Sequence, residues 1–148
     1  MGDNSFYDDD MEDFEPVIEA DVNFLRALET LDVKTIMSCW SDFDRITMLF
    51  PGVELARGQE EVEEAWATVA KNTSRLNIVL HPLSVMRLGD LGWTFLSGSM
   101  VSTHGDETLT VEVFVTNIYR REEDGWKLMH HHAAPSPHQP AYLEQRLN

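Results

Sequence analysis

Cysteine is almost absent from this 148-residue chain. The single Cys39 excludes an internal disulfide and a cysteine-based zinc site. Because Cys39 lies in an apolar helical pattern, we expect a buried, unreactive thiol. Long apolar runs are lacking too: no stretch approaches about eighteen apolar residues, and the N-terminus is acidic where a secretory signal is basic and then apolar. These absences favour a soluble cytoplasmic protein without a membrane partner.

Positive charge is also scarce. The chain has 11 Lys and Arg against 26 Asp and Glu, which gives a net charge of −15 at pH 7. A chain so acidic repels phosphate backbones, which argues against a nucleic-acid partner. The acidic residues crowd the beginning of the chain, where residues 1–21 contain no Lys or Arg. This asymmetry predicts a disordered acidic tail over residues 1–13.

The first half of the chain has helical periodicity. A first helix is expected over residues 15–31, and Asp32 is placed to cap a shorter one that ends near Trp40. A short strand is expected over residues 46–50, and a third helix should begin at Gly58. The apolar stripe of the first helix is predicted to consist of Phe14, Ile18, Val22, Leu25 and Leu28.

From Arg75 onward the apolar period becomes that of β-strands. Strands are expected over residues 76–88, 93–103, 107–121 and 125–135. Short turns between long strands mean antiparallel neighbours, and Pro82 predicts an edge position, a bulge or a bend. Helices followed by a strand meander predict one α+β domain, residues 14–136, in which three N-terminal helices pack against a strongly curved antiparallel sheet. Residues 137–148 form a C-terminal tail.

Three consecutive histidines occupy the last predicted strand. Alternation along a strand would place Trp126, Leu128, His130 and His132 on one face, and Lys127, Met129 and His131 on the other. We therefore expect His130 and His132 to be neighbours on a covered face, and His131 to lie nearer solvent. Paired imidazoles in a pocket can move protons near neutral pH or bind a metal. The alternative is that these histidines are ordinary polar residues in the last strand of a sheet, hydrogen-bonded to backbone and water.

Two more polar residues join the catalytic candidates, His130 and His132. His81 precedes Pro82 and is therefore held extended at a predicted bulge. Glu112 interrupts an apolar strand, so that it either faces solvent or is buried beside a partner that tunes its pKa. Either could be a third metal ligand, but nothing in the sequence joins them to the histidines. No metal or other cofactor is predicted.

Three segments carry a family resemblance. They are FLRAL at residues 24–28 followed by Asp32, Arg57-Gly58 at the start of the third helix, and NIYRR at residues 117–121, which leads through DGWK at 124–127 into the histidine strand. With the order of elements, they resemble the nuclear transport factor 2-like superfamily and its polyketide-cyclase SnoaL-like branch. The resemblance covers residues 15–136. It implies a cone with an apolar pocket at its open end, and homodimers through the outer sheet face.

The resemblance extends to ketosteroid isomerase, but not residue by residue. That enzyme uses an aspartate base and an oxyanion hole formed by a tyrosine and a protonated aspartic acid. The first helix here offers Phe24 and no tyrosine. The cone implied by the resemblance would draw its pocket wall from Trp40, Met48, Phe50, Trp66, Trp93, Phe95, Met100, Phe114 and Asn117.

Two classes of function stay open. In the first, the chain binds a small, flat, largely apolar molecule in the cone, with His130 or His132 as acid or base. In the second, it is a non-catalytic association domain whose sheet face drives homo-oligomerisation. The clustering of polar residues on the late strands, which are expected to line the cone, favours the first.

Overall fold

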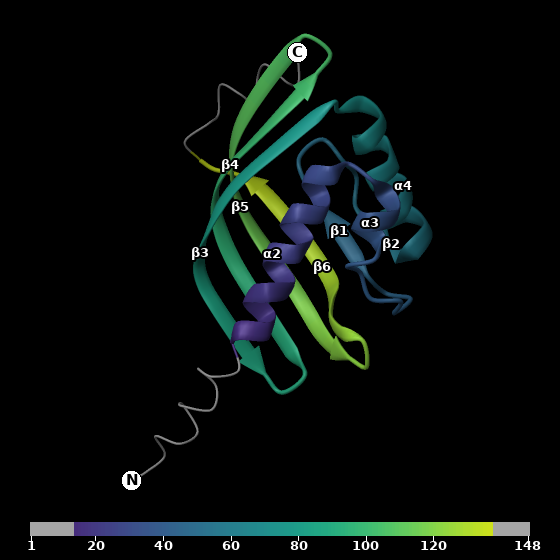
Figure 1. The fold of residues 1–148 in the computed structure, drawn as a ribbon, viewed down its shortest axis with the longest axis vertical. Coiled ribbons are helices and arrows are strands. Elements are labelled where there is room, and N and C mark those ends of the chain that lie inside the picture. Colours follow the sequence, from purple (N-terminus) through teal and green to yellow (C-terminus); the bar gives the residue numbers. More distant parts are fainter. Residues whose placement is uncertain (1–13, 138–148) are drawn as a thin grey trace.

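The computed structural model describes residues 14–137, and within them helices lie against one six-stranded sheet (Figure 1). The predicted acidic tail, residues 1–13, and residues 138–148 of the predicted C-terminal tail lie outside the described residues. Within residues 14–137, the helices are too short or too polar to cross a membrane.

The elements follow the predicted order. The helices are α2 (Glu15–Thr30), α3 (Val33–Met37) and α4 (Gly58–Asn72). The strands are β1 (Thr47–Leu49), β2 (Ala56–Arg57), β3 (Arg75–Leu88), β4 (Leu91–His104), β5 (Glu107–Glu122) and β6 (Gly125–Pro135). They lie in the order β2-β1-β6-β5-β4-β3, where β1 and β6 are parallel and the other pairs antiparallel. This confirms the predicted α+β fold class.

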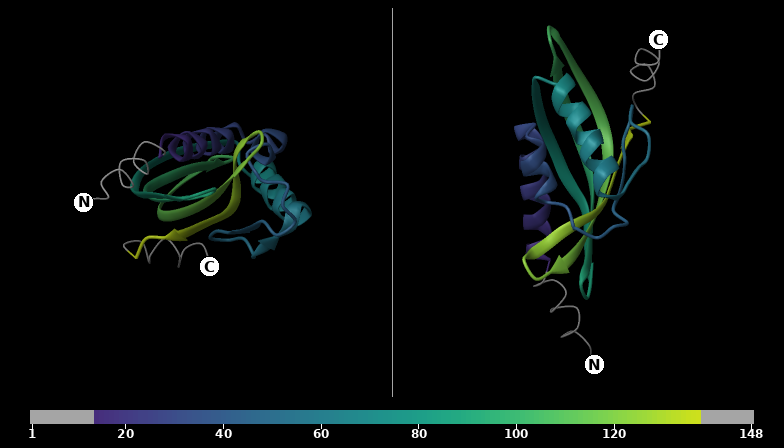
Figure 2. Two further views of the ribbon diagram at one scale, coloured as in Figure 1. Left: turned by 90° about the horizontal axis from the view of Figure 1, so that it is seen from below. Right: turned by 90° about the vertical axis from the view of Figure 1, so that its right-hand side faces the viewer.

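Helix α2 lies across the concave face of the sheet (Figures 1 and 2). Its buried residues are Val17, Asp21, Phe24, Ala27 and Leu28. The predicted stripe is right at Leu28 and in part at Leu25, which packs partly buried against the core, and it is wrong at Val22, which is 39% exposed. Helical spacing fits either a stripe that contains Val22 or one that contains Asp21. A count of apolar residues selects the stripe with Val22, because the other stripe contains a carboxylate.

Helices α3 and α4 begin where the sequence predicts. The Asp32 side chain accepts a hydrogen bond from the Thr35 backbone N–H at 3.1 Å, which confirms the predicted cap of α3. Cys39, just after α3, is partly buried, and this burial raises the pKa of its thiol. Helix α4 begins at Gly58, whose φ of +80° favours glycine, and buries Val62 and Trp66.

The long strands curve around the helices, which gives the sheet the shape of a partly opened cone (Figure 2). The register of β3 against β4 shifts between Pro82 and Ser84, which confirms the irregularity that Pro82 predicted. Strand β3 is also an edge strand. A proline is tolerated there because it has no N–H to donate to a neighbouring strand.

A second bulge changes the faces of the histidine strand. Ile118 pairs with His130 and Tyr119 with Leu128, so Met129 has no partner on β5. One unpaired residue shifts the alternation, and the side chains beyond it exchange faces. Leu128 and His131 are both buried, whereas His132 is exposed. The prediction that His130 and His132 face the interior and His131 lies nearer solvent is therefore wrong.

Candidate functional site

Asp21 is a buried carboxyl inside the cone, with only 5% of its surface exposed. Its Oδ1 accepts hydrogen bonds from Tyr119 Oη at 2.6 Å, Asn117 Nδ2 at 2.8 Å and Thr94 Oγ1 at 3.0 Å. The last two donors face each other across the β4–β5 pair. The sheet therefore delivers three donors to one oxygen of a carboxyl that projects from α2.

Burial sets the charge of this group. Desolvation raises the pKa of Asp21, and the hydrogen bonds from Tyr119, Asn117 and Thr94 oppose that rise. The pKa of Tyr119 is raised well above its ordinary value by burial and by the neighbouring Asp21. Tyr119 is therefore a neutral donor at neutral pH. Sequence reasoning missed Asp21, and the available signal was its position four residues after Val17 and three before Phe24.

Asn117 connects Asp21 to His131. Because Asn117 Nδ2 donates to Asp21, its Oδ1 faces His131 and accepts from His131 Nδ1 at 2.7 Å. This network assigns the proton of the neutral imidazole to Nδ1. Among residues 14–137 no hydrogen-bond partner of Nε2 is found, so this nitrogen keeps a free lone pair.

Aromatic rings surround His131. Its ring centroid lies 5.3 Å from that of Phe24, 5.9 Å from Trp66 and 6.3 Å from Phe50. The side chain is 3% exposed. Burial in this apolar cage, followed by the charges of His130 and His132 as lesser causes, lowers the pKa of His131 to about 3. The imidazole is therefore neutral at pH 7.

The residues predicted to be catalytic lie on the outer face of the sheet. His130 Nδ1 and Thr47 Oγ1 are 2.6 Å apart, and the His130 and His132 rings are 6.2 Å apart. His81 is exposed opposite Ser97, and Glu112 hydrogen-bonds Ser99. Within residues 14–137, no group of three or more His, Cys, Asp or Glu side chains could hold a metal ion.

The residues predicted to line the pocket divide between the two faces. Trp40, Met48, Phe50, Trp66, Met100 and Asn117 belong to the interior. Trp93, Phe95 and Phe114 alternate with buried residues and therefore lie outside, where Phe95 is 38% exposed and stacks on Phe114 at 5.7 Å. The placement predicted for these three is wrong. The physical reason is that β4 and β5 bury the polar Thr94 and Asn117 in place of the neighbouring aromatic residues.

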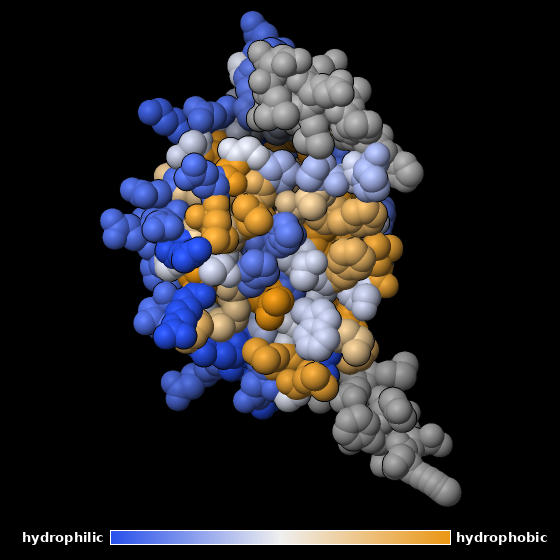
Figure 3. Space-filling model, turned by 180° about the vertical axis from the view of Figure 1, so that it is seen from behind, coloured by the Kyte–Doolittle hydropathy of each residue, from blue (hydrophilic) through white to orange (hydrophobic). Residues whose placement is uncertain are grey.

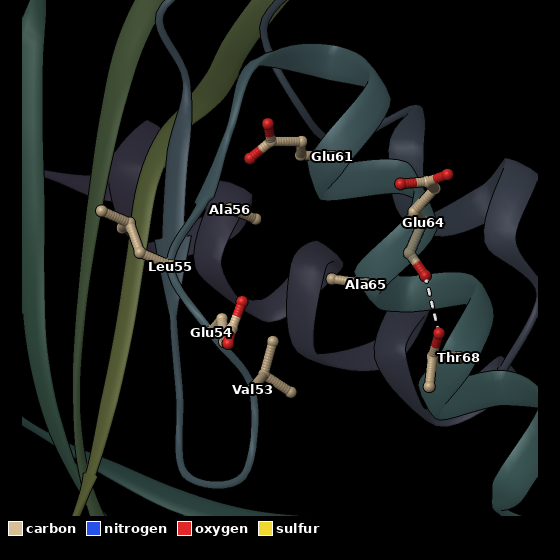
Figure 4. A pocket seen from close by; sticks show the side chains of 8 residues that line it. All are labelled: Val53, Glu54, Leu55, Ala56, Glu61, Glu64, Ala65 and Thr68. Carbon is tan, nitrogen blue, oxygen red and sulfur yellow. Dashed lines mark hydrogen bonds between the residues drawn. The ribbon is translucent and has the colours of Figure 1, made fainter.

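A surface hollow of about 520 Å3 lies apart from this network, between the β1–β2 loop and α4 (Figure 4). Its lining residues are Val53, Glu54, Leu55, Ala56, Glu61, Glu64, Ala65 and Thr68. Three of these side chains are carboxylates, and none belongs to the group around His131. The hollow is an acidic, open surface, whereas the buried network lies inside the cone.

The fold places the protein in the cone-shaped nuclear transport factor 2-like class. The SnoaL-like domain matches residues 17–137, and the chain therefore belongs to the SnoaL-like family. No curated protein matches the chain significantly.

Among solved structures, a proposed dehydratase of the NTF2-like family from Streptomyces avermitilis is 27% identical. The match has a TM-score of 0.77 and covers 83% of this chain and 95% of that chain. A proposed calcium/calmodulin-dependent protein kinase type II association domain from Thiobacillus denitrificans is also 27% identical, with a TM-score of 0.69 and coverage of 79% and 92%. A ketosteroid isomerase-like protein from Erwinia carotovora atroseptica, 16% identical with a TM-score of 0.69 and coverage of 85% and 98%, shares the fold.

Proposed function

We propose that this chain binds a small, largely apolar organic molecule inside the cone and that His131 accepts a proton from it. The observation that carries the proposal is the buried chain of hydrogen bonds from His131 through Asn117 to Asp21. This network holds the His131 imidazole in the tautomer whose proton is on Nδ1, and Nε2 has no hydrogen-bond partner among residues 14–137. A buried ionisable group with a strongly shifted pKa inside a concave fold is a common property of active sites.

The low pKa of His131 leaves the imidazole unprotonated, and so able to accept a proton, before a ligand reacts. Without a ligand, the His131 side chain in this cage of aromatic rings rarely holds a proton at neutral pH, because its pKa is about 3. Negative charge that develops on a bound ligand would favour the imidazolium and raise this pKa. The Asp21 carboxyl, connected through Asn117, adds negative charge behind the ring whenever it is ionised.

The reaction class we favour is elimination of water. A C–H bond next to an electron-withdrawing group breaks, and its proton moves to Nε2. The electron pair forms a C=C bond, and the hydroxyl group on the adjacent carbon leaves as water with the proton that Nε2 returns. The likeness to a proposed dehydratase at 27% identity supports this choice. The rings of Phe24, Phe50 and Trp66 around His131 favour a flat, largely apolar substrate.

A hydroxyl-bearing probe tests the role of His131. 2-Naphthol offers a donor to Nε2, and we expect His131→Phe to weaken its binding about five- to tenfold, the effect of one lost hydrogen bond. The matched control is His132→Phe on the outer face, which should change the affinity less than twofold. Isothermal titration and the imidazole 15N signals report the binding. Equal affinity of wild type and His131→Phe would overturn the proposal.

A second function has its own support. The likeness to a proposed association domain, also at 27% identity, favours a protein that assembles with itself. The outer sheet face carries exposed apolar side chains, among them Val79, Met86 and Phe95. We therefore propose a homodimer through this face, and such assembly is compatible with a ligand inside the cone.

A further inference from the structure

Two buried donors inside the cone have no acceptor. The indole nitrogens of Trp40 and Trp66 have no hydrogen-bond partner among residues 14–137, and each side chain is only 4% exposed. Buried N–H groups in folded proteins are nearly always paired, because an unpaired one has lost its hydrogen bonds to water without replacement. An unpaired buried N–H therefore points to a partner that lies outside residues 14–137.

Only one of these two indoles has a described ring contact with the imidazole. Trp66 has its ring centroid 5.9 Å from that of His131, and it stacks on Phe50 at 5.4 Å. The ring contact described for Trp40 is with Phe24, at 6.2 Å. The unpaired N–H of Trp66 and the bare Nε2 of His131 thus lie on neighbouring rings, one a donor and the other an acceptor.

A trapped water molecule is a poorer partner than a ligand for this donor. A buried water typically makes about three hydrogen bonds. The rings in contact with Trp66 are Phe24, Phe50 and His131, of which His131 alone has polar atoms. A ligand needs only a single acceptor atom here, and its apolar surface suits the surrounding aromatic rings.

We propose that the Trp66 indole N–H binds a carbonyl oxygen of the ligand, so that the substrates are small, flat ketones or related carbonyl compounds. The proposal rests on the proposed function and deepens it. A hydrogen bond to the carbonyl oxygen draws electrons from the neighbouring C–H bond. When His131 Nε2 takes that proton, the electron pair forms an enolate whose negative charge lies on the oxygen that Trp66 holds. The carbonyl then re-forms, the electron pair moves into the C=C bond of the product, and the hydroxyl group on the next carbon leaves as water with the proton from Nε2.

The test compares two bicyclic compounds of similar shape, 1-tetralone with a carbonyl group and tetralin without one. We expect 1-tetralone to bind the wild type and to move the Trp66 indole N–H signal downfield in 15N-edited NMR, whereas tetralin leaves this signal without a downfield shift. Trp66→Phe keeps an aromatic ring and removes the donor. It should weaken 1-tetralone binding about five- to tenfold and leave tetralin binding within about twofold.

The matched control is Trp40→Phe, which removes the other unpaired donor and should change 1-tetralone affinity less than twofold. The free Trp66→Phe protein should melt no lower than the free Trp40→Phe protein, since neither loses a hydrogen bond.

Unchanged 1-tetralone affinity in Trp66→Phe, with 2-naphthol binding still dependent on His131, would overturn this inference alone. Equal losses for both bicyclic compounds would overturn it as well, because they would show a packing role. No binding of either compound by the wild type at millimolar concentration would overturn both this inference and the proposed function.

Discussion

At the scale of single residues, the cone interior holds two ionisable groups whose pKa values burial moves in opposite directions. Desolvation disfavours the charged form of each, which raises the pKa of Asp21 and lowers that of His131 to about 3. Their effects on stability therefore oppose each other. The contribution of Asp21 falls as pH rises from 3.8 through its raised pKa, and that of His131 falls as pH drops below 6.5.

The charge state of His131 gives a prediction about acid stability. The unfolded chain binds a proton at this histidine near pH 6.5, whereas the folded protein does so only at about pH 3. The free energy of unfolding should therefore fall by about 2 kcal/mol between pH 7 and pH 5 through this residue alone. His131→Phe should remove that part of the pH dependence. Urea denaturation at the two pH values measures it.

The control for this prediction is His132→Phe, which changes an exposed imidazole on the same strand. It should keep most of the acid-dependent loss of the wild type, because burial, the largest cause of the low pKa of His131, stays in place. If His131→Phe loses as much stability as the wild type between the two pH values, the imidazole is protonated in the folded protein and is not the neutral group described above.

At the scale of elements, the sequence predicted the strands better than their faces. The histidine strand was expected over residues 125–135 and is found at Gly125–Pro135. Its faces depended on strict alternation, and the unpaired Met129 reverses that alternation before the histidines. A bulge is decided by pairing with a distant strand, so a local pattern cannot reveal it. Pro82 was different because proline imposes its constraint locally.

The close approach of β3 and β4 at Gly98 gives a prediction at this scale. A Cβ at this position would lie 2.0 Å from the Val79 carbonyl oxygen and 3.0 Å from the Leu80 Cα. Backbone atoms cannot move aside as the end of a flexible side chain can, so Gly98→Ala should force β3 and β4 apart. We expect a loss of about 2 kcal/mol in the free energy of unfolding.

Chemical denaturation of the purified variants measures this loss. Ser97→Ala, one residue earlier on β4, is the control and should stay within about 0.5 kcal/mol of the wild type. A Gly98→Ala protein as stable as Ser97→Ala would mean that the sheet can open at this point without cost, and the close approach would not be a requirement of the fold.

At the scale of the whole molecule, the two sheet faces differ in the side chains that they carry. The concave face holds α2 and the hydrogen-bond network of Asp21, Asn117 and His131. The opposite face carries apolar side chains between polar ones (Figure 3). Val79 is 56% exposed there, Met86 41% and Phe95 38%. Contiguous apolar surface of more than a few hundred Å2 is uncommon on a monomer and marks an interaction site.

The last prediction concerns this outer face. Phe95 stacks on Phe114 with an interplanar angle of 17°, so the pair presents a flat apolar surface from neighbouring strands. Two copies of such a flat apolar surface can pair about a two-fold axis. We expect light scattering at micromolar concentration to give twice the chain mass of 16.9 kDa. Phe95→Glu should give a monomer, because it would bury an unpaired carboxylate in the interface.

Leu55→Glu supplies the control, since Leu55 is 43% exposed but lies in the β1–β2 loop, at the opposite edge of the sheet from β3 and its neighbour β4, which carries Phe95. It should leave the dimer intact, which separates loss of the interface from a general effect of added negative charge on a chain of net charge −15. A wild type of monomer mass would contradict the proposed dimer outright. A dimeric Phe95→Glu protein would show that the chains associate through another surface, and the apolar outer face would then need a different partner.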